Sequence, residues 1–461
     1  MTDSAQPTAL INIVGLTTEM LDDRMPRLRA HAASGTLRPL APVLPAVTCS
    51  VQTSMLTGKM PAEHGIVGNG WYERTEGEVR FWKQSNQLVQ AESIWETARR
   101  KQPDFTCANC FWWYAMNAST DICITPRPMY PADGRKLPDI YTTPSDLRDQ
   151  LQSQLGQFPL FHFWGPGADL RSSRWIAESA RIVEKQFKPD LLLVYLPHLD
   201  YDLQRFGPDD PRSDQAMREI DQVAGDLIDA MKQIGRSSII VSEYGITSTT
   251  DGVAPNQLLR SSGLLAVREE EGRELLDPMQ SDAFVVTDHQ IGHVYVRHAE
   301  MIDQVAALLQ DLDGVSEVLG GDSLGDVGLD HARSGDLVII SEPDRWFTWD
   351  YWLEEDKAPD FATTVDIHRK PGYDPRELFL AEGWAGSKFR IGLKLLKKRL
   401  GQRTLMDVIS LETRQVGGSH GRTDAASDGV LILPDTDHDV AARPSCTMVH
   451  DLVMNQLFRS R

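Results

Sequence analysis

Short runs of apolar residues alternate with predicted helices along the first half of the chain. The runs at 9–16 (ALINIVGL), 190–197 (DLLLVYLP) and 237–245 (SSIIVSEYG) are bounded by polar residues or glycine, as buried strands are. Helices are predicted at 21–33 and, with a clear amphipathic pattern, near 212–233. This alternation predicts the α/β class, with a mainly parallel central sheet covered by helices on both faces.

A smaller α/β unit is predicted within this core. It covers 258–340 and contains the apolar runs FVVTDHQIGHVYV and GDLVII as strands, with AEMIDQVAALLQDL as an amphipathic helix between them. We therefore expect a core formed by 1–257 and 341–461, with 258–340 as an inserted cap. The aromatic stretch at 346–352 is a candidate wall for a leaving-group pocket, although ordinary packing is the commoner role of such residues.

The composition of the chain limits the kinds of molecule that it is expected to bind. A net charge of −19 disfavours a nucleic acid polymer, and the chain has no apolar run of about eighteen residues that would span a membrane. The first residues, MTDSAQPTAL, lack the features of a signal peptide, so we expect a cytoplasmic protein.

Cys107 and Cys110 form the only close cysteine pair, and buried reduced thiols are favoured over a metal or redox site. The basic segment 388–403 could contact an anionic membrane surface, but a solvated helix face or a phosphate-steering rim is favoured.

Thr48 marks the first candidate site. It lies between an apolar stretch and the predicted helix CSVQTSMLTG, where unpaired N–H groups and the positive end of the helix dipole favour an anion. Locally, the commoner role of a threonine here is to cap the helix. Asp200 and Glu243 follow two other predicted strands, and ligands of parallel sheets gather at the carboxyl ends of their strands.

The segment P-V-L-P-A-V-T-C, followed by L-T-G and H-G-I-V-G-N, resembles the nucleophile segment of the nucleotide pyrophosphatase/phosphodiesterase family in the alkaline phosphatase superfamily. Partial matches continue in the family's order through LDYDLQRFGP, VSEYGIT and GSHGRTD. The resemblance implies an alkaline phosphatase-like core, with Thr48 as the nucleophile and Asn69 holding a phosphoryl oxygen. It also implies two divalent metal ions, usually zinc.

Three positions depart from the family's metal ligands. Val14 stands where the family has an aspartate, and Gln204 and Tyr244 stand where it has histidines. Asp200 and His420 match the family's ligands, and Glu243 is a conservative exchange. Other side chains could complete the metal shell, the site could keep one metal, or the chain could bind phosphate without catalysis.

Several unassigned residues are candidates to replace the missing ligands. Asp288, His289 and His293 occur together in DHQIGH, where His289 and His293 would share one face of a strand. Asp366 and His368 form a second pair in VDIH. His293 is more often a satisfied core histidine, and Asp366 could simply pair with a neighbouring arginine. The proposed metal ligands are therefore Asp200, Glu243, His420, His368, His289 and Asp366, with Zn²⁺ favoured over Mn²⁺ or Mg²⁺.

These observations predict a metal-dependent hydrolase of small organic phosphate esters, of the phosphodiesterase or nucleotide pyrophosphatase type, with a threonine nucleophile. A binding protein for phosphate ligands on the same scaffold is the alternative outside enzymes. A phosphonate or sulfate ester hydrolase is the alternative within them.

Overall fold

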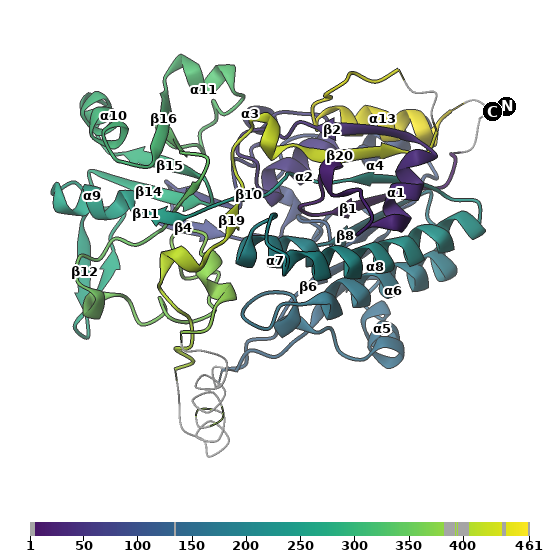
Figure 1. The fold of residues 1–461 in the computed structure, drawn as a ribbon, viewed down its shortest axis with the longest axis horizontal. Coiled ribbons are helices and arrows are strands. Elements are labelled where there is room, and N and C mark those ends of the chain that lie inside the picture. The colour runs from purple at the N-terminus through teal and green to yellow at the C-terminus, as the bar shows by residue number, and fades with distance from the viewer. Residues whose placement is uncertain are drawn as a thin grey trace.

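A mixed eight-stranded sheet forms the centre of the protein (Figure 1), and the computed structural model describes residues 5–132, 135–381, 392, 394, 405–435 and 439–459. The strand order is β2-β20-β9-β1-β8-β5-β6-β7. The strands are β1 (Thr8–Ile13), β2 (Thr36–Leu40), β5 (Cys107–Cys110), β6 (Ile122–Pro126), β7 (Ile140–Thr143), β8 (Leu191–Leu196), β9 (Ser237–Val241) and β20 (Gly429–Leu433). The run from β9 to β6 is parallel, and β2, β20 and β7 pair antiparallel at the edges. The predicted mainly parallel sheet is confirmed.

Helices cover both faces of this sheet. One face carries α1 (Pro26–Ala33), α6 (Leu170–Phe187), α7 (His198–Phe206) and α8 (Ser213–Gln233), and the other carries α2 (Thr48–Thr57), α4 (Ile94–Lys101) and α13 (Met448–Leu457). Helix α8 buries Met217, Ile220 and Leu227 at helical spacing, as its pattern predicts. The helix predicted from residue 21 begins only at Pro26, because proline favours the first helical position, and Thr18–Met20 forms a separate 3-10 turn.

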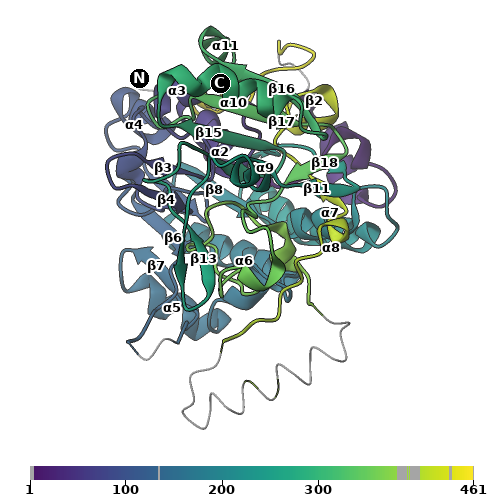
Figure 2. The same cartoon turned by 90° about the vertical axis from the view of Figure 1, so that its left-hand side faces the viewer.

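A smaller antiparallel sheet lies beside the central one and faces the viewer in Figure 2. Its order is β14-β15-β17-β16, with β14 (Ala283–Asp288), β15 (Ile291–Val296), β16 (Val315–Gly320) and β17 (Leu337–Ser341). The helices α9 (Pro255–Ser261), α10 (Ile302–Gln310) and α11 (Asp322–Asp326) accompany it. The run FVVTDHQIGHVYV is a hairpin rather than the single strand we expected, because the chain turns at His289, whose φ is 61°.

Short elements complete the described fold. They are β3 (Gly70–Glu73), β4 (Glu78–Phe81), β10 (Thr247–Ser248), β11 (Asp251–Val253), β12 (Val267–Glu270), β13 (Arg273–Leu276), β18 (Arg345–Phe347), β19 (Gly418–Ser419), α3 (Pro61–His64) and α5 (Leu147–Leu155). No helix of the described residues is both long enough and apolar enough to cross a lipid bilayer. Apart from Gly392 and Lys394, the basic segment 388–403 lies outside the described residues.

The aromatic residues at 346–352 are buried, and all of them except Trp346 pack into the apolar core of the smaller unit. Trp346, Trp349 and Trp352 are buried, and Trp349 contacts Trp352 with ring centroids 5.0 Å apart. None of them lines the cavity described below. Ordinary packing, rather than a leaving-group pocket, is their role in this structure.

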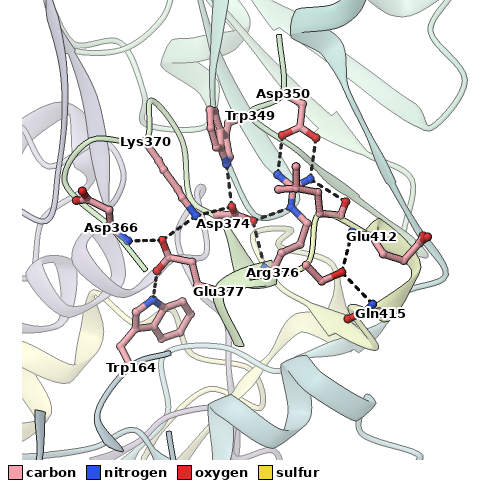
Figure 3. Close-up of polar contacts among 12 residues, drawn as sticks. Trp164, Trp349, Asp350, Asp366, Lys370, Asp374, Arg376, Glu377, Glu412 and Gln415 are labelled. Carbon is pink, nitrogen blue, oxygen red and sulfur yellow. Dashed lines mark hydrogen bonds and ion pairs between the residues drawn. The ribbon is translucent and has the colours of Figure 1, made fainter. Parts of the chain in front are cut away.

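A buried network of charges fixes the segment that follows this stretch (Figure 3). The guanidinium of Arg376 donates to both oxygens of Asp350, at 2.6 and 2.7 Å, and through Nε to Asp374 at 2.8 Å. Lys370 Nζ contacts Asp374 at 2.8 Å and Glu377 at 2.9 Å. All of the charges in this network find partners inside the protein, as buried charges require.

Two tryptophans connect the network to its surroundings (Figure 3). The indole N–H of Trp349, in the core of the smaller unit, donates to Asp374 at 3.0 Å. The indole N–H of Trp164, which lines the cavity, donates to Glu377 at 2.6 Å. The network therefore holds one wall of the cavity to the smaller unit.

Candidate functional site

Thr48 is the first residue of α2 and does not cap it. Val47 occupies the N-cap position with an extended backbone, and no side chain caps the helix there. The Thr48 side chain is buried but lines a cavity, and its hydroxyl lies 3.2 Å from the hydroxyl of Tyr244. The capping role that Thr48 would have had from local sequence is therefore wrong, and its hydroxyl points to another group.

Asn69 lies next to the start of α2. Its Oδ1 accepts a hydrogen bond from the backbone N–H of Cys49 at 2.9 Å. Its backbone N–H and Nδ2 donate to Asp288 at 2.9 and 3.1 Å. Asn69 thus ties the first turn of α2 to the end of β14. Its side chain is engaged by these partners and does not line the cavity at Thr48, so the expected contact with a phosphoryl oxygen stays a prediction.

Asp200 is held by neutral donors. Gln204, one turn later on α7, donates from Nε2 to Asp200 Oδ2 at 2.7 Å, and the Tyr244 hydroxyl donates to Asp200 Oδ1 at 3.4 Å. The hydroxyl of Tyr373 donates to Gln204 Oε1 at 2.9 Å, which fixes the orientation of that amide. Burial raises the pKa of Asp200 to about 7, although both donors lower it.

Glu243, just beyond β9, is held in the same way. Asn12 and Gln52 donate their side-chain amides to Glu243 Oε1 at 2.6 and 2.5 Å. The backbone N–H of Trp113 donates to Gln52 Oε1, so the amide nitrogen of Gln52 must face the carboxyl group. Burial raises the pKa of Glu243 to about 8, with smaller lowering effects from Gln52, Asn12 and the nearby Thr48 hydroxyl.

His420 and His289 come together in a column of four rings, in which the two outer pairs are stacked and the two imidazoles are tilted by 37° to each other. Its order is Tyr244, His420, His289 and Tyr373, with centroid distances of 3.6, 3.7 and 3.6 Å. His420 donates from Nδ1 to the carbonyl of Ala46 at 2.7 Å, and His289 Nδ1 lies 2.8 Å from Asp288 Oδ1. Burial lowers the pKa of both imidazoles well below its usual range, so both rings are neutral. Neither Nε2 has a hydrogen-bond partner among the described residues, and each can therefore accept one.

The other candidate ligands do not join this column. His293 Nε2 donates to the carbonyl of Val67 while its Nδ1 accepts from Gly335, so it is a satisfied core histidine and shares no face with His289. His368 is an exposed residue at the cavity wall, with Nδ1 3.4 Å from the carbonyl of Phe81. The backbone N–H of Asp366 donates to Glu377 in the charged network, and Asp366 does not line the cavity.

The donor set does not fit the family's two-metal centre. Among the described residues, no three side chains of His, Cys, Asp or Glu lie close enough together to hold a metal ion. Val14 is packed in the hydrophobic core, and Gln204 and Tyr244 donate hydrogen bonds to the carboxyl group of Asp200. Since carboxamide groups and a phenol occupy the lone pairs that metals would need, the six expected ligands are not assembled as a metal shell.

A cavity of 440 Å³ connects this site to the surface. Thr48, Asp200 and His420 line its buried end, whereas the exposed rings of Tyr130 and Phe161 line its mouth. The tryptophans of its wall, Trp82, Trp113 and Trp164, were not among the residues predicted from the sequence. These residues come from three separate segments, and the only local signal was their occurrence in aromatic clusters such as FWW.

Comparison with known families agrees with this arrangement. The model of the family described as type I phosphodiesterase / nucleotide pyrophosphatase matches residues 8–374. The chain belongs to this family. The match includes Thr48, Asn69, Asp200 and Glu243 but ends before His420.

Two curated relatives in yeasts are similar to part of this family member. An uncharacterized pyrophosphatase/phosphodiesterase of Schizosaccharomyces pombe is 26% identical over 222 residues, which is 46% of this chain and 38% of the relative. Ectonucleotide pyrophosphatase/phosphodiesterase 2 of Saccharomyces cerevisiae is 25% identical over 224 residues, which is 45% of this chain and 39% of the relative. The match thus spans about two fifths of the length of these relatives.

Solved structures share the fold over nearly the whole chain. Phosphonoacetate hydrolase from Sinorhizobium meliloti, in complex with phosphonoformate, has a TM-score of 0.63 at 15% identity and covers 98% of this chain and 96% of its own. Murine ectonucleotide pyrophosphatase / phosphodiesterase 5, as an inactive threonine-to-alanine variant in complex with AMP, has a TM-score of 0.59 at 12% identity and covers 99% and 96%. At these identities the likeness shows the fold.

Proposed function

We propose that this family member hydrolyses small organic phosphate esters with Thr48 as the nucleophile. The observation that carries the proposal is the hydroxyl chain from Thr48 Oγ1 to Tyr244 and on to Asp200 Oδ1, at 3.2 and 3.4 Å, at the buried end of an open cavity. A threonine hydroxyl needs a proton acceptor to become a nucleophile, and this chain provides one. The threonine-to-alanine change that accompanies inactivity in the murine relative agrees with this role for Thr48.

The proposed step conserves atoms and charge. Thr48 Oγ1 forms a bond to phosphorus and the bond from phosphorus to the ester oxygen breaks, while the threonine proton passes through the Tyr244 hydroxyl to the Asp200 carboxylate. The ester oxygen takes a proton from a water molecule and leaves as an alcohol. The hydroxide formed from that water then attacks the phosphothreonine, the bond from phosphorus to Thr48 Oγ1 breaks, and the proton held by Asp200 returns through Tyr244 to restore the hydroxyl.

The surroundings suit a phosphoryl group of low charge. The start of α2 contributes the positive end of a helix dipole beside Thr48. The free Nε2 atoms of His289 and His420 accept hydrogen bonds, which suits a protonated phosphoryl oxygen or the attacking water. The proposed step involves no divalent metal, because carboxamide and phenol donors already engage the carboxyl groups of Asp200 and Glu243.

A binding function without turnover is the second candidate. It is favoured by the replacement of three family ligands by Val14, Gln204 and Tyr244, since loss of the metals removes the charge stabilisation on which the family's chemistry depends. Ligand binding with no hydrolysis under any condition would support it.

Substitution of Thr48 tests the proposal. We expect Thr48→Ala to fold with an unchanged melting temperature and to lose at least two orders of magnitude in turnover of the best substrate among p-nitrophenyl phosphate mono- and diesters and phosphonates. Thr48→Ser should keep part of the activity and acquire a phosphoryl group that mass spectrometry detects on residue 48. Tyr244→Phe, which removes only the bridging hydroxyl, should impair the wild type and Thr48→Ser and should add nothing to the loss caused by Thr48→Ala. A Thr48→Ala protein that turns over substrate at the wild-type rate would refute the nucleophile.

A further inference from the structure

The wall of the cavity is a continuous aromatic surface. Tyr373, the last ring of the stacked column, contacts Trp164 and Trp82 with centroid distances of 5.5 and 6.1 Å. Trp82 in turn contacts Trp113 at 5.0 Å. The column beside Thr48 therefore passes without a break into the tryptophans of the wall.

Aliphatic side chains complete this wall. The cavity is also lined by Val365, Ile367, Leu380 and Val408, all from the segments that follow the smaller unit. The volume of 440 Å³ lies within the range of about 300–1,000 Å³ that is typical of small-molecule sites. The cavity can thus enclose an organic group much larger than the phosphate.

Two neutral polar side chains of the wall, Gln84 and His162, are already engaged. Gln84 donates from Nε2 to the carbonyl of Pro126 at 2.6 Å and accepts from Arg127 through Oε1 at 3.0 Å. His162 Nδ1 donates to the carbonyl of Gly167 at 2.7 Å. A nucleobase or ribose would lose its hydrogen bonds to water on entering and would find these groups occupied, which disfavours a nucleoside.

Two exposed rings extend the apolar surface to the outside. Tyr130 is 57% exposed and Phe161 is 55% exposed, and both line the mouth of the cavity. Large exposed apolar side chains that rim a cavity mark a binding surface. An apolar ligand can therefore remain in contact with rings from the mouth to Thr48.

We propose that the ester group of the substrate is a hydrocarbon, an alkyl or aryl-alkyl group, which lies along this wall with its phosphate at Thr48. The inference rests on the proposed phosphate-ester function and names the substrate class. Burial of hydrocarbon in the cavity supplies the affinity, and the phosphate supplies the orientation.

Binding of a chain-length series tests the inference without turnover. The Thr48→Ala protein is titrated with butyl, hexyl and octyl phosphate below their micelle concentrations, with the matching alcohols and with AMP, and tryptophan fluorescence and calorimetry report binding. We expect affinity for the alkyl phosphates to rise about fourfold per methylene, equivalent to about 0.8 kcal/mol, and to exceed that for AMP. Val365→Asn should reduce this gain per methylene, whereas Ile234→Asn, at a residue 57% exposed that does not line the cavity, should leave it unchanged.

The outcomes separate the two proposals. Affinity that is flat with chain length, or tighter binding of AMP, would overturn the hydrocarbon inference while leaving phosphate hydrolysis intact. Equal affinity for the alcohol and the phosphate of each chain length would keep the hydrocarbon site and refute a phosphate site at Thr48.

Discussion

The carboxyl group of Glu243 makes the stability of the protein depend on pH, and Glu243→Gln should remove the part of that dependence that Glu243 contributes. Glu243 is fully buried and its pKa is raised to about 8, mainly by burial. The same carboxyl has a pKa of roughly 4.3 in an unfolded chain. Because the folded pKa is the higher one, the folded protein holds this proton more tightly, and its stability falls as the pH rises from about 4 to about 8.

The size of the effect follows from the two pKa values. Their separation of nearly 4 units corresponds to roughly 5 kcal/mol over the whole range, of which roughly 3–4 kcal/mol fall between pH 5 and 8. Glutamine keeps a carbonyl oxygen for the hydrogen bonds from Asn12 and Gln52 but cannot ionise. We expect the variant to be within about 1 kcal/mol of wild type at pH 5 and several kcal/mol more stable at pH 8.

Urea unfolding of both proteins between pH 5 and 8, at constant ionic strength, measures this difference. Asp200 and Asp288, whose pKa values are raised to about 7 and about 6, titrate in the same window. Their contributions largely cancel in the comparison of wild type with variant. Glu300→Gln, at an exposed glutamate, is the control and should leave the wild-type slope unchanged. Parallel pH profiles for wild type and Glu243→Gln would refute the reasoning. A wild type that gains stability over the variant at pH 8 would indicate that a bound cation neutralises the carboxylate.

Two further predictions concern the metal and the charged network. Dialysis against EDTA should leave the melting temperature and the binding of p-nitrophenyl phosphate unchanged, because the donor set does not fit a metal shell. Stoichiometric zinc by elemental analysis, with a lower melting temperature after EDTA, would contradict this. Linkage predicts that a bound metal stabilises the folded protein by roughly 2.7 kcal/mol at a hundredfold excess over its dissociation constant. Arg376→Met should lower the free energy of unfolding in urea by roughly 3–5 kcal/mol, because it leaves Asp350 and Asp374 buried beside fewer cations. The control is Arg212→Met, at a side chain that is 65% exposed, which should lower it by less than about 1 kcal/mol. Equal losses would show that burial does not determine how much the ion pairs of Arg376 contribute to stability.

The apolar pattern predicts the central sheet well, because buried parallel strands are continuous apolar runs. Strands β8 and β9 fall within their predicted runs, β1 begins one residue before its run, and α8 begins and ends within a residue of its predicted range. The hairpin at β14 and β15 was missed, because its turn contains His289 and Gln290 rather than a glycine or asparagine pair.

The residues that meet at the site could be predicted from the sequence, but the hydrogen bonds that hold them could not. Motif order is enough to place Thr48, Asp200 and His420 together, and all three line one cavity. The donors that hold the carboxyl groups could not be foreseen, because Asn12 is 231 residues from Glu243 and ordinary amides carry no motif. The same holds for Tyr373, which reaches the site only because the segment after the smaller unit returns to α7.

The column of stacked rings restricts how a ligand can enter. Tyr244 and His420 belong to the central unit, whereas His289 belongs to the hairpin of the smaller unit, and their centroids are only 3.6 to 3.7 Å apart along the column. A hinge motion that separated the two units would have to separate the rings of His420 and His289 and expose both buried imidazoles to water. These contacts therefore favour entry of a ligand between Tyr130 and Phe161, a route that leaves the ring column intact.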